Sequence, residues 1–130
     1  MEQAIQLSIA VQNVPGQLGR VCRVLAHAGV NVRGVSVDDG IDFSTIRVLV
    51  SDPASAKDAL REAGLCFSAW DVLVVELDDK PGTLEDVAVR LGEAGVNIHY
   101  IYGTGDGTQG KAVLVLRVSD TTRARQTLSE

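Results

Sequence analysis

The sequence predicts an α+β protein that contains two similar units in tandem. The first observation is an internal repeat, because the stretch NVPGQLGRVCRVLAHAGVNV at 13–32 matches DKPGTLEDVAVRLGEAGVNI at 79–98 with one constant offset. The second is that each half alternates between a hydrophobic period of two and one of about 3.6, which indicates strands and helices. We therefore expect a first domain at 1–70 and a second at 71–130.

The first half begins with a strand, a helix and a hairpin. Apolar and polar residues alternate over 4–12, which is typical of a half-buried strand. A helical pattern runs over 18–28, and Gly29 is suited to end this helix because glycine readily takes the left-handed conformation. Two segments rich in β-branched residues, at 30–38 and 43–51, predict a pair of strands around the turn DDGID.

A second helix and a short strand complete the first half. Asp52 followed by Pro53 is typical of a helix start, Gly64 ends that helix, and 66–70 is expected to be a strand. The resulting order is strand, helix, strand, strand, helix, strand. This order is the split βαβ arrangement of ferredoxin-like domains, an antiparallel sheet with both helices on one face.

The second half repeats this pattern from Asp71 without a flexible linker. The expected elements are a strand at 71–77, a helix at 84–94, strands at 97–103 and 111–118, and a helix at 121–128. By the repeat, the chain stops about eight residues before the counterpart of Trp70. The second unit therefore lacks its last strand, so its sheet has three strands, borrows one, or is completed by residues absent from this sequence.

Composition and charge exclude several classes of protein. The hydrophobic share of 45% is ordinary for a soluble globular chain, and no apolar run approaches the roughly 18 residues that a membrane span needs. The net charge of −5 and the lack of a basic block argue against nucleic acid, which is bound through clusters of Lys and Arg. Because no secretory signal is seen at the N-terminus, we expect a cytoplasmic protein with no membrane or nucleic-acid partner.

The sequence shows no constellation for catalysis or metal binding. His27, His99, Cys22 and Cys66 are not grouped at metal-ligand spacings, and nucleophile motifs such as G-x-S-x-G are missing. A GxGxxG at 105–110 joins two predicted strands, whereas a pyrophosphate loop leads from a strand into a helix, so a hairpin tip is favoured. We therefore expect no cofactor and no enzymatic activity.

The two Pro-Gly helix entries are the candidate binding sites. A helix N-terminus exposes unpaired N–H groups and a partial positive charge that attract carboxylates, and Gly16 and Gly82 have no side chain to screen those amides. Asn13 and Asn31 offer donors and acceptors that suit a zwitterion, provided that the chain brings them to the same end of the sheet. The alternative is that Pro-Gly only marks a turn and that each Asn caps a local turn.

The repeated motif resembles that of ACT domains, which are small regulatory modules that bind amino acids. The motif is N-x-P-G-x-L, an apolar helix and then a-G-V-N-[IV], and both halves carry it over nearly the whole chain. The resemblance implies βαββαβ units and is closer to free-standing tandem ACT proteins than to a fragment of an enzyme. It also implies that units pair and hold an amino acid at their interface, near the loops that follow the first strands.

The resemblance implies a set of ligand contacts in each half. They are Asn13, Val14, Pro15, Gly16, Gln17, Leu18 and Asn31 in the first half, and Asp79, Gly82, Thr83, Leu84 and Asn97 in the second. Asp79 replaces Asn13, and its carboxylate would repel a ligand carboxylate. We therefore expect two non-equivalent sites, of which the first is the better carboxylate site.

Two functions follow from these observations. The leading hypothesis is an amino-acid-binding regulatory protein that forms a homodimer and acts on a metabolic enzyme or another regulator. The alternative is a structural or oligomerisation module that regulates a partner protein without a ligand of its own. An incomplete second sheet favours the alternative, because an open edge is able to pair with another chain.

Overall fold

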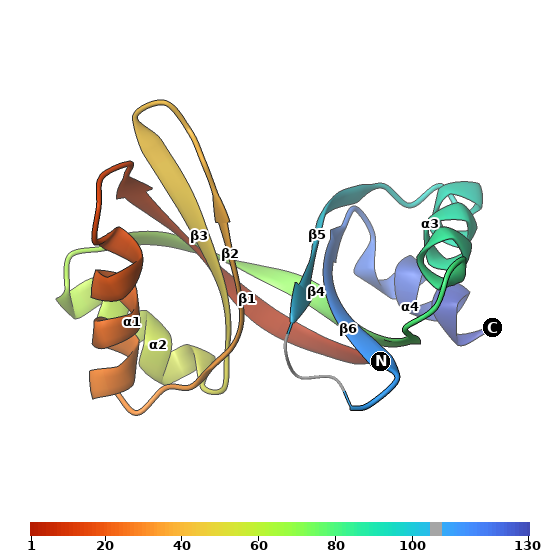
Figure 1. The fold of residues 1–130 in the computed structure, drawn as a ribbon, viewed down its shortest axis with the longest axis horizontal. Helices are drawn as coiled ribbons and strands as arrows, with labels where there is room; N and C mark the ends of the chain where they lie inside the picture. The colour runs from red at the N-terminus through yellow and green to blue at the C-terminus, as the bar shows by residue number, and fades with distance from the viewer. Residues whose placement is uncertain (105–107) are drawn as a thin grey trace. The chain divides into compact units, whose positions relative to one another are not determined.

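The computed structural model describes residues 1–104 and 108–130 (Figure 1). Its elements are β1 (Glu2–Gln12), α1 (Gln17–His27), β2 (Val32–Asp38), β3 (Phe43–Val50), α2 (Pro53–Glu62), β4 (Cys66–Asp78), α3 (Thr83–Glu93), β5 (Ile98–Thr104), β6 (Lys111–Val118) and α4 (Thr121–Ser129). They form two compact units, Ile5–Trp70 and Met1–Ala4 with Asp71–Glu130. The predicted α+β class with ferredoxin-like units is confirmed.

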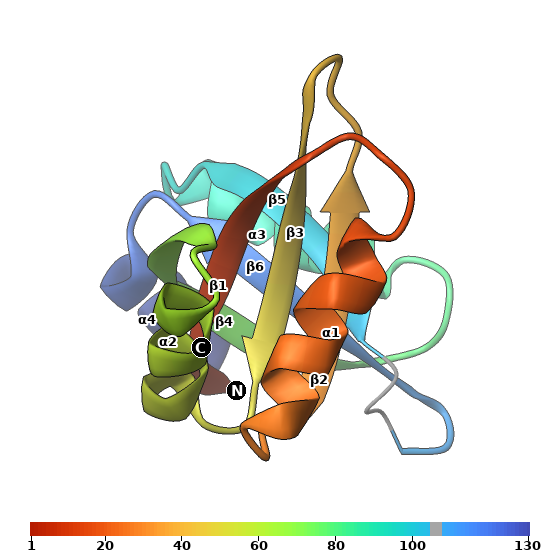
Figure 2. The same cartoon turned by 90° about the vertical axis from the view of Figure 1, so that its left-hand side faces the viewer.

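In the unit Ile5–Trp70 the strands are ordered β2-β3-β1-β4. Both β1 and β2 pair antiparallel with β3, for example Leu7 opposite Val48 and Val37 opposite Ile46. Helices α1 and α2 contact each other and lie on one face of the sheet (Figure 2). The core between these layers consists of buried aliphatic side chains that include Leu7, Ile9, Leu25 and Leu60.

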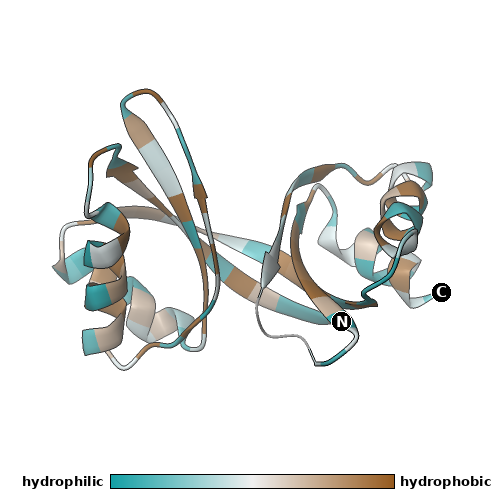
Figure 3. Ribbon diagram, in the orientation of Figure 1, coloured by the Kyte–Doolittle hydropathy of each residue, from teal (hydrophilic) through white to brown (hydrophobic). Residues whose placement is uncertain are grey.

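Residues at the helix starts and along the helices explain where the helices begin and which side of each is buried. Asp52 caps α2, since its Oδ1 accepts the Ser55 N–H at 3.1 Å, and α1 begins after Gly16, which has a φ of +92°. Val21 and Leu25 form the buried stripe of α1, and hydrophilic residues occupy much of its remaining surface (Figure 3). In the described part of the chain, every helix falls short of the length and apolar character that crossing a membrane requires.

The unit Met1–Ala4 with Asp71–Glu130 has the strand order β1-β4-β6-β5. Strand β6 pairs antiparallel with β4 and β5, and α3 and α4 contact each other as α1 and α2 do. The ladder shifts register between Ile98 and Tyr100, and the same irregularity occurs between the repeat-related Val32 and Gly34. The repeat therefore extends to the irregularities of the sheet.

The N-terminal residues occupy the fourth strand position of the second unit. Strand β4 runs unbroken over Cys66–Asp78, so it ends the first βαββαβ order and starts the second. No strand follows α4 in the described residues, and β4 lies between β6 and β1 in the strand order. Because Met1–Ala4 belongs to the second unit, that unit borrows its fourth strand from the beginning of the chain.

The GxGxxG stretch connects β5 to β6, and its residues 105–107 lie outside the described residues. Its assignment as a hairpin tip therefore stays a prediction there. The described end of the stretch is a turn in which Gly110 has a φ of +77° and Lys111 donates its N–H to the Thr108 carbonyl at 3.0 Å. This turn leads into a strand, which is not the context of a pyrophosphate loop.

Candidate functional site

Asn13 holds the turn between β2 and β3. Its Nδ2 donates to Asp39 Oδ1 at 2.7 Å and to the Gly40 carbonyl at 2.8 Å, and its N–H donates to the Asp42 carbonyl at 3.0 Å. Gly40 is required in this turn, because a Cβ there would collide with the backbone oxygen of Phe43. The side-chain donors of Asn13 are therefore already used, which leaves Oδ1 as the atom for a ligand.

Asn31 lies at the opposite end of α1 from Asn13. The Asn31 N–H donates to Ser51 Oγ at 3.0 Å, and the Ser51 N–H donates to the Asn31 carbonyl at 2.9 Å. The 11 residues of α1 separate the two asparagines by about 16 Å at a rise of about 1.5 Å per residue. The structure therefore does not bring the two predicted contacts of one unit to the same end of the sheet.

The starts of α1 and α3 have the same backbone conformation but differ in charge. Gly16 and Gly82 have φ values of +92° and +91°, and neither helix has a side-chain hydrogen bond at its N-cap. The first turn of α1 contains no acidic residue, whereas that of α3 contains Glu85 and Asp86. Acidic groups in the first turn already neutralise the positive end of the helix dipole, so the start of α1 is the stronger attractor of an anion.

The other predicted contacts surround these helix starts. Thr83 donates its hydroxyl to the Lys80 carbonyl at 3.2 Å, so it stabilises the turn before α3. Gln17 is partly buried, and its Oε1 has no exposed surface and accepts no hydrogen bond from the described residues. The remaining contacts are exposed, and they are Val14, Pro15, Leu18 and Leu84.

The second unit repeats the backbone arrangement, with Asp79 in the position of Asn13. The Asp79 N–H donates to the Gly110 carbonyl at 3.0 Å, and the Asn97 N–H donates to Ser119 Oγ at 2.9 Å. Next to Asp79, a hydrogen bond from the Lys111 ammonium lowers the pKa of Asp78 from its ordinary value. Asp78 is therefore paired with the Lys111 ammonium, and the contrast with the first copy lies in Asp79 and in the acidic first turn of α3.

A cavity of about 190 Å³ beside α1 was not anticipated from the sequence. Gln17, Arg20 and Cys66 are among the residues that line it. Arg20 Nη2 donates to the Ala63 carbonyl at 3.2 Å, which positions the guanidinium beside the end of α2. The signal that would have identified Arg20 is its repeat partner, since the offset places Asp86 at the equivalent position.

A larger cavity of about 410 Å³ lies between α3 and α4, but its cations already have partners. Arg90 Nη2 donates to the Thr127 carbonyl at 2.5 Å, and Arg123 Nε donates to the Ala94 carbonyl at 2.5 Å. These arginines stabilise the ends of the two helices. We therefore do not assign a ligand to this cavity in spite of its size.

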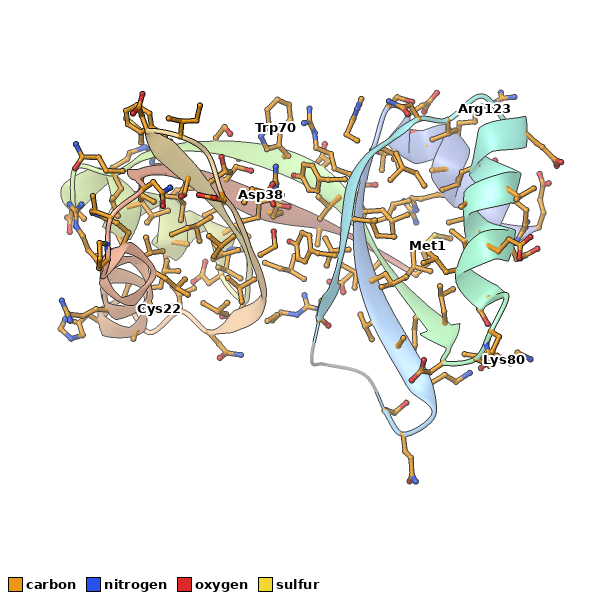
Figure 4. All side chains as sticks on the ribbon, turned by 45° about the horizontal axis from the view of Figure 1, so that its top comes forward. Met1, Cys22, Asp38, Trp70, Lys80 and Arg123 are labelled. Carbon is orange, nitrogen blue, oxygen red and sulfur yellow. The ribbon has the colours of Figure 1, made fainter. Side chains whose placement is uncertain are left out.

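The polar groups at the helix starts are mainly hydrogen-bonding groups. Within 1–104 and 108–130, no group of three His, Cys, Asp or Glu side chains is placed to hold a metal ion. Cys22 and Cys66 are free and exposed, and Cys22 lies on α1 (Figure 4). The arrangement at the helix starts offers backbone donors, amide groups and one arginine, which are groups that hold a small polar molecule.

Comparison with known proteins gives one family and several similar structures. The family model described as ACT domain pair matches residues 3–130. Protein BT0572 from Bacteroides thetaiotaomicron is 31% identical, with a TM-score of 0.90 over 98% of this chain and 87% of that one. No curated protein matches the sequence.

Two structures with lower identity share the fold. The ligand-free regulatory subunit of aspartate kinase from Thermus thermophilus is 18% identical, with a TM-score of 0.71 over 98% of this chain and 89% of that one. The regulatory subunit of aspartate kinase from Thermus flavus is 17% identical, with a TM-score of 0.63 over 99% of this chain and 95% of that one. At these identities the similarity concerns the fold alone.

Proposed function

This chain belongs to the ACT domain pair family, and on that basis we propose that it is a regulatory protein that binds an amino acid and has no turnover of its own. The observation that carries the proposal is the start of α1. There Gly16 has no side chain that could cover the backbone N–H groups, and the first turn of α1 contains no acidic residue. Such a helix start suits the carboxylate of an amino acid.

The proposal places the ligand between paired ACT units. Asn13 and Asn31 lie at opposite ends of α1, so one small ligand that contacts both types of asparagine has to be shared by two copies of the motif. A homodimer that pairs the first units of two chains supplies a second Asn31 and is therefore part of the proposal. Ligand binding then regulates by favouring the paired arrangement through its differential affinity.

The first copy of the motif is proposed as the carboxylate site. Asn13 is neutral, whereas its counterpart Asp79 is acidic. The helix after Asp79 also has Glu85 and Asp86 in its first turn. Like charges at the second copy disfavour an incoming carboxylate. The two copies share a fold, and we propose that they differ in affinity.

The proposed partner is a metabolic enzyme or another regulator in the cytoplasm. Two proteins with this fold are regulatory subunits of aspartate kinase, which supports a metabolic enzyme as the kind of target. Cys22 and Cys66 are unpaired, and free thiols are typical of a reducing compartment. The proposal includes neither a nucleic-acid nor a membrane partner.

The alternative, a module that acts without a ligand, has lost its main argument. It relied on an open edge in the second sheet, but β4 has β1 as its neighbour on that side. That alternative predicts that Asn31→Ala and Asn97→Ala leave regulation unchanged, whereas changes to the edge strands abolish it. Amino-acid binding predicts that at least Asn31→Ala weakens the response.

A melting screen against the twenty amino acids tests the proposal. A ligand at 100 times its Kd stabilises the native state by about 2.7 kcal/mol, which raises the Tm of a chain of this size by several degrees. We expect a rise with one amino acid or a few related ones, and a smaller rise in Asn31→Ala. Asn97→Ala is the matched control from the second copy. Absence of any shift at millimolar concentrations would disprove amino-acid binding.

A further inference from the structure

Helices α1 and α3 occupy equivalent places in the repeat but have opposite charges. Helix α1 contains Arg20 and Arg23 and no acidic residue. Helix α3 contains Glu85, Asp86 and Glu93 together with one arginine. The repeat offset places Asp86 at the position of Arg20. The chain therefore has a basic and an acidic version of the same helix.

The basic charge of α1 lies on the side that faces away from the core. Val21 and Leu25 are the buried residues of α1, and at 3.6 residues per turn Arg23 falls on the opposite side of the helix. Arg23 and Arg20 are both exposed. Because Arg20 Nη2 donates to the Ala63 carbonyl after α2, Arg20 lies at the border with α2. Arg23 is therefore the central charge of the outward face of α1.

The outward face of α3 is acidic and partly apolar. Val87 and Leu91 are the buried residues of this helix, whereas Glu85 and Val89 lie on the opposite side. Both are exposed, and Val89 keeps 49% of its surface accessible. The arginine of α3, Arg90, is directed toward α4, since its Nη2 donates to a carbonyl of that helix at 2.5 Å. The outward charge of α3 is therefore negative.

Small residues on the two outward faces allow a close approach of another helix. Gly19 and Ala26 lie on either side of Arg23 along α1, and both are exposed. A Cβ at Gly19 would meet no atom within 4 Å, so the space above this glycine is open. On α3, Gly92 is also exposed and lies near Val89. Helices that meet at small residues pack at about 8 Å, the short end of the usual range of interaxial distances.

We propose that α1 of one copy of this chain docks on α3 of a second copy. The arginines of α1 face the carboxylates of α3, and Val89 packs into the space above Gly19. The occupant is a second copy because both complementary faces are present on every chain, and opposite charges steer such surfaces together. The contact is heterologous, since it joins different surfaces of the two chains.

This contact goes beyond the pairing proposed above for amino-acid binding. It uses the outward faces of α1 and α3, and it includes neither Asn13 nor Asn31. It also requires no ligand. Each helix has only 11 residues, so the interface is small and its association is weak and dependent on concentration. Exposed charges are screened by ions, so salt should weaken the contact.

Sedimentation velocity of the intact chain, without any amino acid, measures this contact. Arg23→Glu reverses the central charge of α1, and Glu85→Arg reverses a charge on the outward face of α3. Each change should lower the association constant by about ten-fold, which corresponds to about 1.4 kcal/mol, because it places like charges opposite each other. Lys80→Glu and Glu62→Arg are the matched controls, since both reverse exposed charges outside the two helices' outward faces. Melting curves verify that each variant is folded.

A mixture of the two variants tests the pairing of the helices directly. Chains with Arg23→Glu repel one another, and so do chains with Glu85→Arg, but each variant has the face that suits the other. The mixture should therefore associate about as strongly as the wild type. The proposal is overturned if the wild type does not self-associate at millimolar concentration, if the two variants associate as strongly as the controls, or if mixing restores nothing. Because no amino acid is present, these results are independent of the melting screen.

Discussion

At the scale of residues, Gly16 and Gly82 determine where α1 and α3 begin. Both have φ near +90°, yet a Cβ at either position would meet no atom within 4 Å. Replacement by alanine is therefore opposed by backbone strain and not by a clash. Because no clash is involved, a substitution at either glycine tests the backbone conformation without disturbing the packing.

Gly16→Ala should destabilise the protein by about 1–2 kcal/mol, because the left-handed conformation has that cost for other residues. Gly19→Ala is the matched control. It lies inside α1 with open space around it, so the change should stabilise by about 0.5–1 kcal/mol. Urea unfolding measures both values, and the same sign for both changes would contradict the assigned helix start.

Asp52 couples the stability of α2 to pH. Its pKa is lowered from the ordinary value of 3.8, first by the hydrogen bond from the Ser55 hydroxyl and then by the Ser55 N–H. A lowered folded pKa means that Asp52 stabilises the fold fully above 3.8 and loses this contribution as the pH falls through the folded value.

Asp52→Ala should therefore lower the Tm at about pH 6, and its difference from the wild type should shrink at pH values below the folded pKa. Scanning calorimetry over a pH series measures this difference. Ser55→Ala removes the main cause of the shift and should reproduce part of the effect. A difference that stays constant down to acidic pH would show that the carboxylate charge does not stabilise α2.

At the scale of elements, Asp78 and Lys111 join the ends of β4 and β6. The two residues are opposite each other in the ladder and form an ion pair. The hydrogen bond between them lowers the pKa of Asp78 and raises that of Lys111. The stabilisation from Asp78 is thus present above its ordinary pKa and lost as the pH falls through the lowered value.

Lys111→Met should raise the pKa of Asp78 towards 3.8, as followed by NMR titration of its carboxyl carbon. Lys80→Met is the control, because Lys80 is the smallest of the charges that lower this pKa. We expect a larger shift in Lys111→Met than in Lys80→Met. Equal shifts in the two variants would mean that the cross-strand pair does not form in solution.

Most elements could be predicted from the sequence because their signals are local. The predicted strand at 111–118 matches β6, and the Asp-Pro start of α2 lies where the sequence places it. The limits of β4 were harder to predict. The sequence predicts two strands, at 66–70 and 71–77, but the structure has one continuous strand there. No turn residue separates the two segments, and the alternating pattern alone does not show that one strand passes from the first unit into the second.

The candidate site was less predictable than the fold. Sequence spacing identifies Asn13 and Asn31, but which end of the sheet each occupies depends on the direction of α1 between them. Arg20 and Cys66 share a cavity although 46 positions separate them in the sequence, and no local pattern links them. Such tertiary proximity becomes visible only once the strands are ordered.

At the scale of the whole molecule, β1 and β4 each serve both compact units. Ile5–Gln12 belongs to the first unit and Met1–Ala4 to the second, while β4 contributes Cys66–Trp70 to the first and the rest to the second. The borrowed strand therefore makes the second unit depend on the start of the chain.

Removing Met1–Ala4 should expose the side of β4 that faces β1. Hydrogen exchange of the β4 amides after Trp70 should become faster by about ten-fold or more, since lost pairing lowers the free energy of local opening. The amides of β3 are the internal control and should change little. Unchanged protection in β4 would contradict the borrowing of this strand.

The two copies of the fold carry different polar residues at their helix starts. The first copy has the neutral Asn13 and an uncompensated helix start, and the second has Asp79 with acidic residues in the first turn of α3. Duplication thus keeps the βαββαβ frame while the polar residues at the helix starts diverge. We propose that this difference leaves one strong amino-acid site per chain.

Isothermal titration calorimetry distinguishes one amino-acid site per chain from two. Each of the twenty amino acids is titrated into the wild type, and the number of molecules bound per chain is measured. We expect one strong site per chain, with binding weakened by Asn31→Ala and retained in Asn97→Ala. Two equal sites per chain, or no binding heat with any amino acid over a range of temperatures, would contradict it.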